Sequence, residues 1–104
     1  MMPLYSAMQE LKIAQPESEE QARDFLETLD DKVQEQLINA VYLGREHIHS
    51  EELRSDLPIS REYVDHIDRA DYPGILVEKR GNIPTYLDKL TECANASGFD
   101  LNQL

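Results

Sequence analysis

The chain has 104 residues and carries 21 Asp and Glu side chains against 10 Lys and Arg, a formal net charge of −11 at pH 7. This length fits one domain with a single core. A surface this acidic repels phosphate groups, which disfavours binding to nucleic acid or anionic lipid. No apolar run approaches the ~20 residues that span a bilayer. The start also lacks the basic and apolar stretches of a secretory signal, so we expect a cytoplasmic protein.

Helical spacing of apolar residues dominates the first half of the chain. Leu4, Met8 and Leu11 fall on one helical face, although residues 1–16 could also form a loosely attached segment. Apolar residues recur with the same period through residues 22–29 and 33–41. This pattern predicts one helix after another, and no stretch alternates as a strand does.

Start and stop residues support these helices. Ser18 followed by Gln21 has the spacing of a capping box. The pair Asp30-Asp31 offers an N-cap to the next helix. Gly44 suits the left-handed position that follows a helix C-terminus.

The second half predicts shorter helices. Ser50 could cap a helix over residues 51–56, and Ser60 could cap another over residues 60–70 that ends at Tyr72-Pro73-Gly74. The run Ile75-Leu76-Val77 is too short to distinguish a strand from a buried turn.

The end of the chain predicts one more helix and an apolar tail. Pro84 fits its first turn and Gly98 its end. Leu101 and Leu104 should fold back on the core, and they are the first place to look for contact with a second copy. We therefore expect an all-α protein, a small single-domain bundle of five or six short helices over residues 1–104, with homodimerisation left open.

One stretch resembles the DNA-binding helix-turn-helix family. In residues 52–67 the apolar side chains sit where that motif packs two helices across a tight turn. A regulator of this kind would use residues 51–70 and contact DNA through Arg61, His66 and Arg69. The family favours a small residue at the position of Arg54 and a glycine in the turn near Pro58. Any corner between two helices gives the same apolar pattern.

The histidines and the cysteine are the remaining candidates for chemistry. His47 and His49 flank one residue, so in an extended loop both rings could face one metal ion, although further ligands would be needed. Solvated loop histidines are the simpler interpretation, and a metal-dependent enzyme is the alternative. Cys93 lies on the apolar side of its predicted helix and reads as a packed thiol. No residue pattern indicates a catalytic site, a metal or a cofactor, so we expect a non-enzyme.

Two short runs carry a family resemblance. Residues 37–45 end in Tyr42-Leu43-Gly44-Arg45, and residues 83–90 contain Tyr86-Leu87 with a second leucine three positions later. In this the chain resembles a group of short uncharacterised bacterial proteins. The resemblance implies a bacterial, cytoplasmic, helical protein and makes Gly44, Arg45 and Tyr86 the positions to watch. It implies no activity.

The charge is the strongest indication of function. We expect a non-enzymatic protein-interaction or regulatory domain whose partner is a protein, such as one with a basic surface, because opposite charge speeds encounter. A nucleic-acid-mimicking inhibitor is a special case of this, with carboxylates in place of phosphates. The helix-turn-helix regulator is the alternative from another class.

Overall fold

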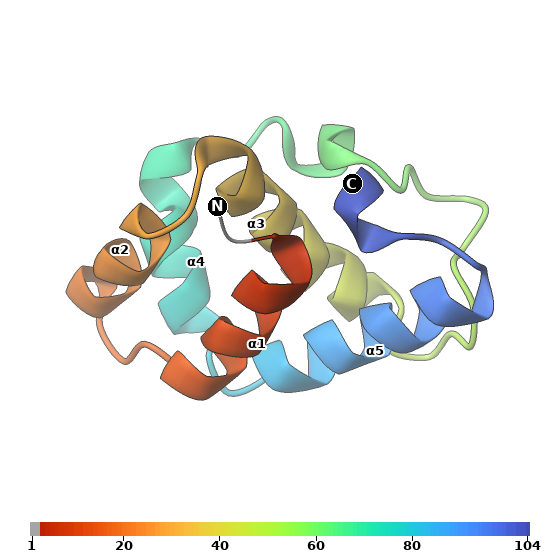
Figure 1. Ribbon diagram of the computed structural model, residues 1–104, viewed down its shortest axis with the longest axis horizontal. Coiled ribbons are helices and arrows are strands. Elements are labelled where there is room, and N and C mark those ends of the chain that lie inside the picture. Colours follow the sequence, from red (N-terminus) through yellow and green to blue (C-terminus); the bar gives the residue numbers. More distant parts are fainter. Residues whose placement is uncertain (1–2) are drawn as a thin grey trace.

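A computed structural model describes residues 3–104, which form five α-helices and three short 3-10 helices with no strand. In chain order they are α1 (Leu4–Ala14), α2 (Glu19–Glu27), α3 (Asp31–Glu46), η1 (Arg61–Val64), η2 (Arg69–Asp71), α4 (Tyr72–Glu78), α5 (Ile83–Ala96) and η3 (Leu101–Gln103). The predicted all-α class is confirmed. Figure 1 shows α3 through the middle of the molecule, α1 and α5 against it, and α2 beside α4 at one end.

The core is built around α3 and α5. The apolar side chains of α5 lie on one face, whereas those of α3 surround the helix, which packs against α1 and η1 as well as α5. The buried members are Val33, Leu37, Ile38, Ala40, Val41, Leu43, Ile83, Leu87, Leu90, Cys93 and Ala94. Because burial of one large aliphatic side chain stabilises by about 1.5–3 kcal/mol, this pair of helices supplies much of the driving force for folding.

The N-terminal segment, for which the sequence also allows loose attachment, contributes to this core. Leu4, Ala7, Met8 and Leu11 of α1 are at most 2 % exposed. An ion pair between Lys12 Nζ and Asp88 Oδ1, 2.7 Å long, joins α1 to α5. The apolar face that the sequence predicts therefore packs against the rest of the molecule.

The predicted N-cap Ser18 is confirmed, and the Gln21 side chain bonds one residue before the position that a capping box uses. The Ser18 hydroxyl accepts a hydrogen bond from the Gln21 N–H at 3.1 Å. The Gln21 side-chain oxygen in turn accepts one from the Glu17 N–H at 2.8 Å. Two main-chain donors at the helix start are satisfied in this way.

The start and end of α5 are also as predicted. Pro84 lies in its first turn. Gly98 adopts a left-handed conformation with φ of 67°, and the Phe99 N–H donates to the Ala94 carbonyl at 2.8 Å. This is the hydrogen bond of a Schellman motif, which requires the left-handed residue.

The helix predicted over residues 51–56 is wrong, because this stretch forms turns and bends. Its main-chain donors are bound by side chains from elsewhere. The Leu53 N–H donates to the Ser97 hydroxyl at 2.9 Å, and the Arg54 N–H donates to His47 Nε2 at 3.0 Å. A six-residue helix does not offset the cost of its own nucleation, so these contacts determine the path of the chain.

The helix predicted over residues 60–70 is also wrong. Ser60 is an N-cap as expected, and its hydroxyl accepts from the Glu62 N–H at 3.3 Å. The bonds that follow are of the 3-10 type, such as that from the Ile67 N–H to the Val64 carbonyl at 3.0 Å. Apolar residues three apart fit this tighter turn as well as an α-helix. The two α-helices of a helix-turn-helix are therefore absent from residues 51–70.

The sequence predicts that a helix ends at Tyr72-Pro73-Gly74, but a helix begins there instead. These residues open α4, and Pro73 occupies the first turn, where its missing N–H has no partner to lose. Residues 75–77 are helical, so neither the strand nor the buried turn is correct.

The apolar tail folds back as predicted. Leu101 and Leu104 are 0 % and 3 % exposed. The Leu101 N–H donates to the Tyr5 hydroxyl at 2.9 Å, and the Gln36 side chain donates to the main-chain oxygens of Asn102 and Leu104, both at 3.1 Å. Because both leucines are buried within their own chain, they offer no surface to a second copy.

Candidate functional site

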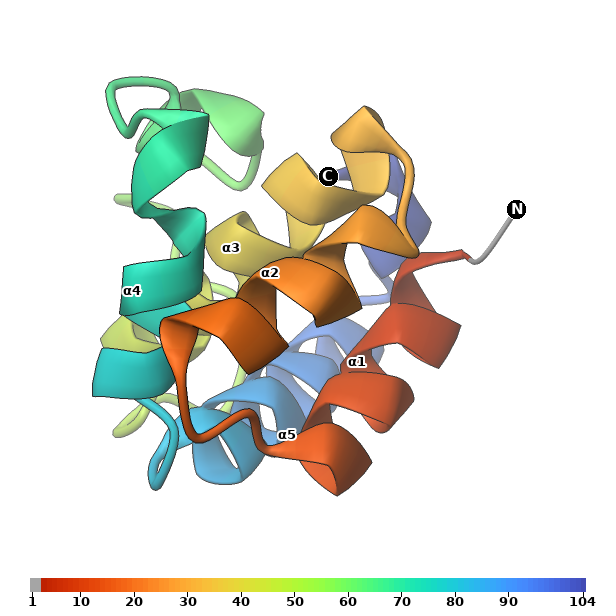
Figure 2. The ribbon, with the colours of Figure 1, turned by 90° about the vertical axis from the view of Figure 1, so that its left-hand side faces the viewer.

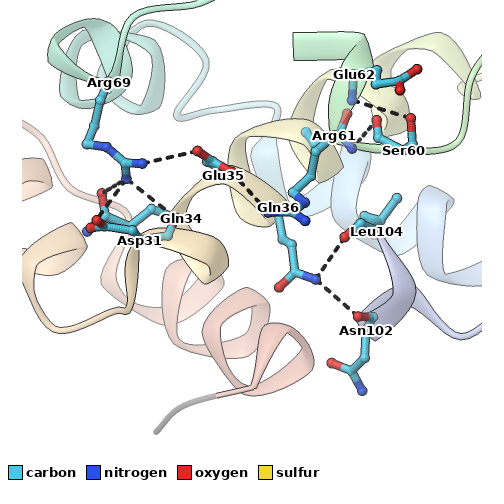
Figure 3. Close-up of polar contacts among 11 residues, drawn as sticks. Asp31, Gln34, Glu35, Gln36, Ser60, Arg61, Glu62, Arg69, Asn102 and Leu104 are labelled. Atoms are coloured by element: carbon cyan, nitrogen blue, oxygen red, sulfur yellow. Dashed lines mark hydrogen bonds and ion pairs between the residues drawn. The ribbon is translucent and has the colours of Figure 1, made fainter. Parts of the chain in front are cut away.

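The two arginines proposed for DNA contact converge on one carboxylate of α3. Arg61 Nη1 lies 3.2 Å from Glu35 Oε2, and Arg69 Nη2 lies 3.1 Å from Glu35 Oε1. Arg69 also reaches Asp31 at 3.6 Å and the side-chain oxygen of Gln34 at 3.2 Å. Figure 3 shows both guanidinium groups turned toward α3. We call Glu35, Arg61 and Arg69 the Glu35 cluster.

The Glu35 cluster argues against the DNA-binding alternative. A phosphate contact needs a cation with charge to spare, whereas each arginine here is paired with carboxylate. His66 is exposed and lies apart from the cluster, between η1 and η2. The structure thus brings Arg61 and Arg69 together but not on a recognition helix, which corrects the motif-based expectation.

A hollow of about 430 Å³ adjoins the Glu35 cluster. Ser60, Tyr72 and Leu104 are among its lining residues. The Ser60 hydroxyl is engaged at the start of η1. Burial, and then the charge of Glu35, raise the pKa of the Tyr72 phenol above its ordinary value. Neither group is poised as a nucleophile or a base, so the cluster reads as a structural attachment of residues 61–71 to α3.

His47 is a buried structural residue, contrary to the expectation of a solvated loop or a metal ligand. It is 0 % exposed and forms the C-cap of α3. Its Nδ1 lies 2.7 Å from the Leu43 carbonyl, and its Nε2 accepts the Arg54 N–H. A carbonyl can only accept and an amide can only donate. The ring is therefore neutral with its proton on Nδ1, and neither nitrogen is free for a metal.

His49 does not form a metal site with His47. It is exposed, and within residues 3–104 no group of three or more His, Cys, Asp or Glu side chains is placed to hold a metal ion. Within the same residues, no helix has the length and apolar character to cross a membrane.

Gly44 and Tyr86, two of the positions to watch, contact each other directly. Gly44 is inside α3, which continues to Glu46, so the expected helix stop is wrong. A Cβ at Gly44 would lie 2.1 Å from the Tyr86 carbonyl oxygen and 2.6 Å from its carbon. The missing side chain lets the main chain of α5 approach α3. Arg45, the third position, is exposed in the last turn of α3, where a cation is favourable.

Cys93 is buried and its thiol donates to the Ser50 carbonyl at 3.6 Å. Desolvation by burial is the main cause that raises the pKa of this thiol. A raised pKa lowers the thiolate fraction and hence the reactivity.

Two buried polar residues of α3 are missed by the sequence reading. Gln36 holds the tail, and Asn39 donates from Nδ2 to the Ser60 carbonyl at 2.7 Å. The Asn39 Oδ1 is buried and has no hydrogen-bond partner among the described residues. Their spacing of three, within an otherwise apolar stretch, is the signal that could have identified them as buried attachment points.

Most of the acidic side chains on the surface have no basic partner. Six of the ten basic residues form ion pairs with seven carboxylates. The other 14 of the 21 carboxylates have no lysine or arginine within ion-pair distance in the described chain, and all are exposed. They are Glu10, Glu19, Glu20, Asp24, Glu27, Asp30, Glu51, Glu52, Glu62, Asp65, Asp68, Asp71, Glu78 and Asp100.

The remaining basic residues do not form a positive face. Arg23 lies on α2, while Lys32 and Arg45 lie near opposite ends of α3, about 20 Å apart at 1.5 Å per residue. Lys79 lies over the ring of Tyr42, 5.1 Å from its centroid.

Comparisons with protein-family models, curated proteins and solved structures each found no match. The resemblance to the short bacterial proteins remains a prediction.

Proposed function

We propose that this protein is a non-enzymatic interaction domain that binds a basic partner protein through its acidic surface, in the cytoplasm. The observation that carries the proposal is the exposure of all 14 carboxylates that lack a basic partner. Charge of one sign over a surface accelerates encounter with a partner of opposite charge, and salt weakens that encounter.

Four of these carboxylates lie at regular spacing along the segment between α3 and α4. Glu62, Asp65, Asp68 and Asp71 recur every third residue, with Glu62 in η1, Asp71 in η2 and the other two in the connection between these helices. We call these four residues the acidic row. It is the surface we assign to the partner.

Zero-length cross-linking in a lysate of the native cell tests the proposal, because a carbodiimide joins carboxylates to lysines in direct contact. We expect lysine peptides of a partner protein, attached at the acidic row and lost as salt is raised. A variant with Glu62→Gln, Asp65→Asn, Asp68→Asn and Asp71→Asn should retain less of this partner in an affinity capture without cross-linker, a readout that does not depend on carboxylate chemistry. The matched control removes four charges from α2, by Glu19→Gln, Glu20→Gln, Asp24→Asn and Glu27→Gln.

Two results would contradict the proposal. One is capture of the partner, without cross-linker, to the same extent by the wild-type chain and by both variants. The other is retention of duplex DNA by the wild-type chain at physiological ionic strength. If duplex DNA displaces the captured partner, the interaction is nucleic-acid mimicry.

A further inference from the structure

A groove runs between the C-terminal half of α3 and α4, beneath residues 63–67. It consists of two adjoining hollows of about 530 and 400 Å³ that share Tyr42, His66 and Ile67 in their linings. The main neighbour of α4 is α2 and not α3 (Figure 2). The two hollows are lined by side chains of α3, α4 and residues 63–67. We call it the Tyr42 groove.

The walls of the groove are aromatic and acidic. Tyr42 and Tyr63 contribute half-buried rings. Asp71, the N-cap of α4, and Glu78, its last residue, both line the groove. Neither carboxylate has a basic partner among residues 3–104. Aromatic faces beside carboxylates attract guanidinium and ammonium groups. The lining therefore disfavours an anion.

The electrostatic environment of Tyr42 agrees with this lining. Burial, and then the charge of Glu78, raise the pKa of its phenol above the ordinary value, while Arg45 opposes them. Arg45 lies with Glu46 at the other end of the groove. A ligand cation therefore fits best at the end formed by Asp71 and Glu78.

The ring of Tyr42 already holds a cation of the same chain. The Lys79 ammonium lies 5.1 Å from the ring centroid and forms no ion pair with a described carboxylate. A cation held over an aromatic ring alone is weakly bound, by about 0.5–1 kcal/mol at an exposed site. A group that reaches both the ring and the two carboxylates would displace it.

We propose that the Tyr42 groove binds an arginine side chain of the basic partner, which stacks on Tyr42, donates to Asp71 and Glu78, and displaces Lys79. Arginine fits better than lysine because its planar guanidinium stacks on an aromatic face and donates in two directions. This inference rests on the proposed function and extends it, since Asp71 belongs to both the acidic row and the groove.

The test is a titration of the isotope-labelled protein with a short blocked arginine peptide, followed by amide chemical shifts. The copy of the peptide with citrulline is the control, because citrulline has the same shape and no charge. We expect shifts at Tyr42, His66, Gly74 and Glu78 with arginine and none with citrulline. A lysine peptide should bind more weakly.

Two loss-of-contact variants refine the test. Tyr42→Leu and Glu78→Gln should each weaken arginine binding roughly threefold or more, the size of one exposed cation–π contact or ion pair. Glu20→Gln, at an exposed unpaired carboxylate of α2, removes the same charge and should change binding little. Because Glu78 is exposed, Glu78→Gln keeps the fold even where Tyr42→Leu does not.

Lys79→Ala gives the sharpest result. Removal of the competing ammonium should strengthen arginine binding about two- to threefold. Lys32→Ala removes an equal charge at the start of α3 and should leave binding near the wild-type value.

The inference is overturned if the shifts map to α2, if citrulline binds as well as arginine, or if Lys79→Ala and Lys32→Ala act alike. In each case cross-linking of a partner at the acidic row would still stand, so the two proposals fail separately. Loss of cross-linking with intact arginine binding at the groove would instead remove the proposed function alone.

Discussion

The helical body (residues 4–46 and 72–104) and the connecting segment (residues 47–71) are held in place by different forces. The body buries apolar stripes of five helices in one cluster. In the segment, Val64 is the only apolar side chain that is fully buried. Leu53, Ile59, Tyr63 and Ile67 pack against the core but are only partly buried. Polar contacts to α3 add to this attachment, from Asn39 to Ser60 and from Glu35 to two arginines.

This difference explains how the segment can be long, acidic and still ordered. Hydrophobic burial is non-directional and tolerates many paths, whereas a hydrogen bond fixes the two groups that it joins. Polar contacts, together with a few partly buried apolar side chains, thus hold 25 residues whose surface carries mainly carboxylates. The body provides stability, and the segment provides the surface that we assign to a partner.

The largest expected loss of stability comes from a substitution in the helical body. Gly44→Ala should destabilise the protein by roughly 3 kcal/mol, at the upper end of overpacking costs, because its Cβ would collide with the Tyr86 main chain. Gly74→Ala is the matched control inside α4, where a Cβ meets only ordinary contacts with Glu19. It should stabilise by about 0.5 kcal/mol. Chemical denaturation measures both. Equal effects at the two glycines would mean that α3 and α5 can move apart.

The next effect tests the junction between body and segment. His47→Ala should cost about 2–3 kcal/mol, since it leaves a cavity and removes the acceptor of the Arg54 N–H. Hydrogen exchange at the Arg54 amide should accelerate more than at the amides of α5. His49→Ala, at an exposed ring, should change stability by less than about 0.5 kcal/mol. Similar exchange rates at Arg54 in wild type and variant would show that His47 does not hold the segment.

The cluster that fastens the segment gives a smaller effect. Glu35→Gln removes the carboxylate shared by Arg61 and Arg69, and partly exposed ion pairs contribute about 1 kcal/mol or less. We expect faster hydrogen exchange through residues 61–71 with little change in global stability. Glu62→Gln is the control, because Glu62 is exposed and has no ion pair among residues 3–104. If both variants exchange alike, the ion pairs of Glu35 do not contribute to holding the segment.

The same division separates what the sequence predicts from what it does not. In the body, helical period and caps such as Ser18 and Gly98 act locally, so the helices are visible in the sequence. In the segment, the acceptor for Arg54 is a side chain seven residues earlier, and Glu35 pairs with residues 26 and 34 positions away. Contacts of this kind leave no periodic pattern in the sequence. Gly44 was misread for a related reason, because only the neighbouring helix shows that its missing side chain is used in packing.

The smallest expected effect is the loss of stability at alkaline pH that follows from the raised pKa values of tyrosines in the two regions. Burial is the main cause that raises the pKa values of Tyr42 and Tyr72 in the body and of Tyr63 in the segment above the ordinary 10.0. The folded state then holds these protons more tightly than the unfolded state. Their contribution to stability is complete below pH 10 and is lost as the pH rises through the raised values.

Phenolate absorbance and thermal unfolding, measured together from neutral to alkaline pH, check this. Tyr63→Phe should remove one of the phenols that ionise above the ordinary tyrosine pKa. Glu78→Gln should lower the pKa of Tyr42 only in part, because the charge of Glu78 ranks below burial among the causes. If Tyr42, Tyr63 and Tyr72 all titrate at the ordinary value, their rings are solvated. The walls of the Tyr42 groove would then be more open than the structure shows, and an arginine stacked there would gain correspondingly less.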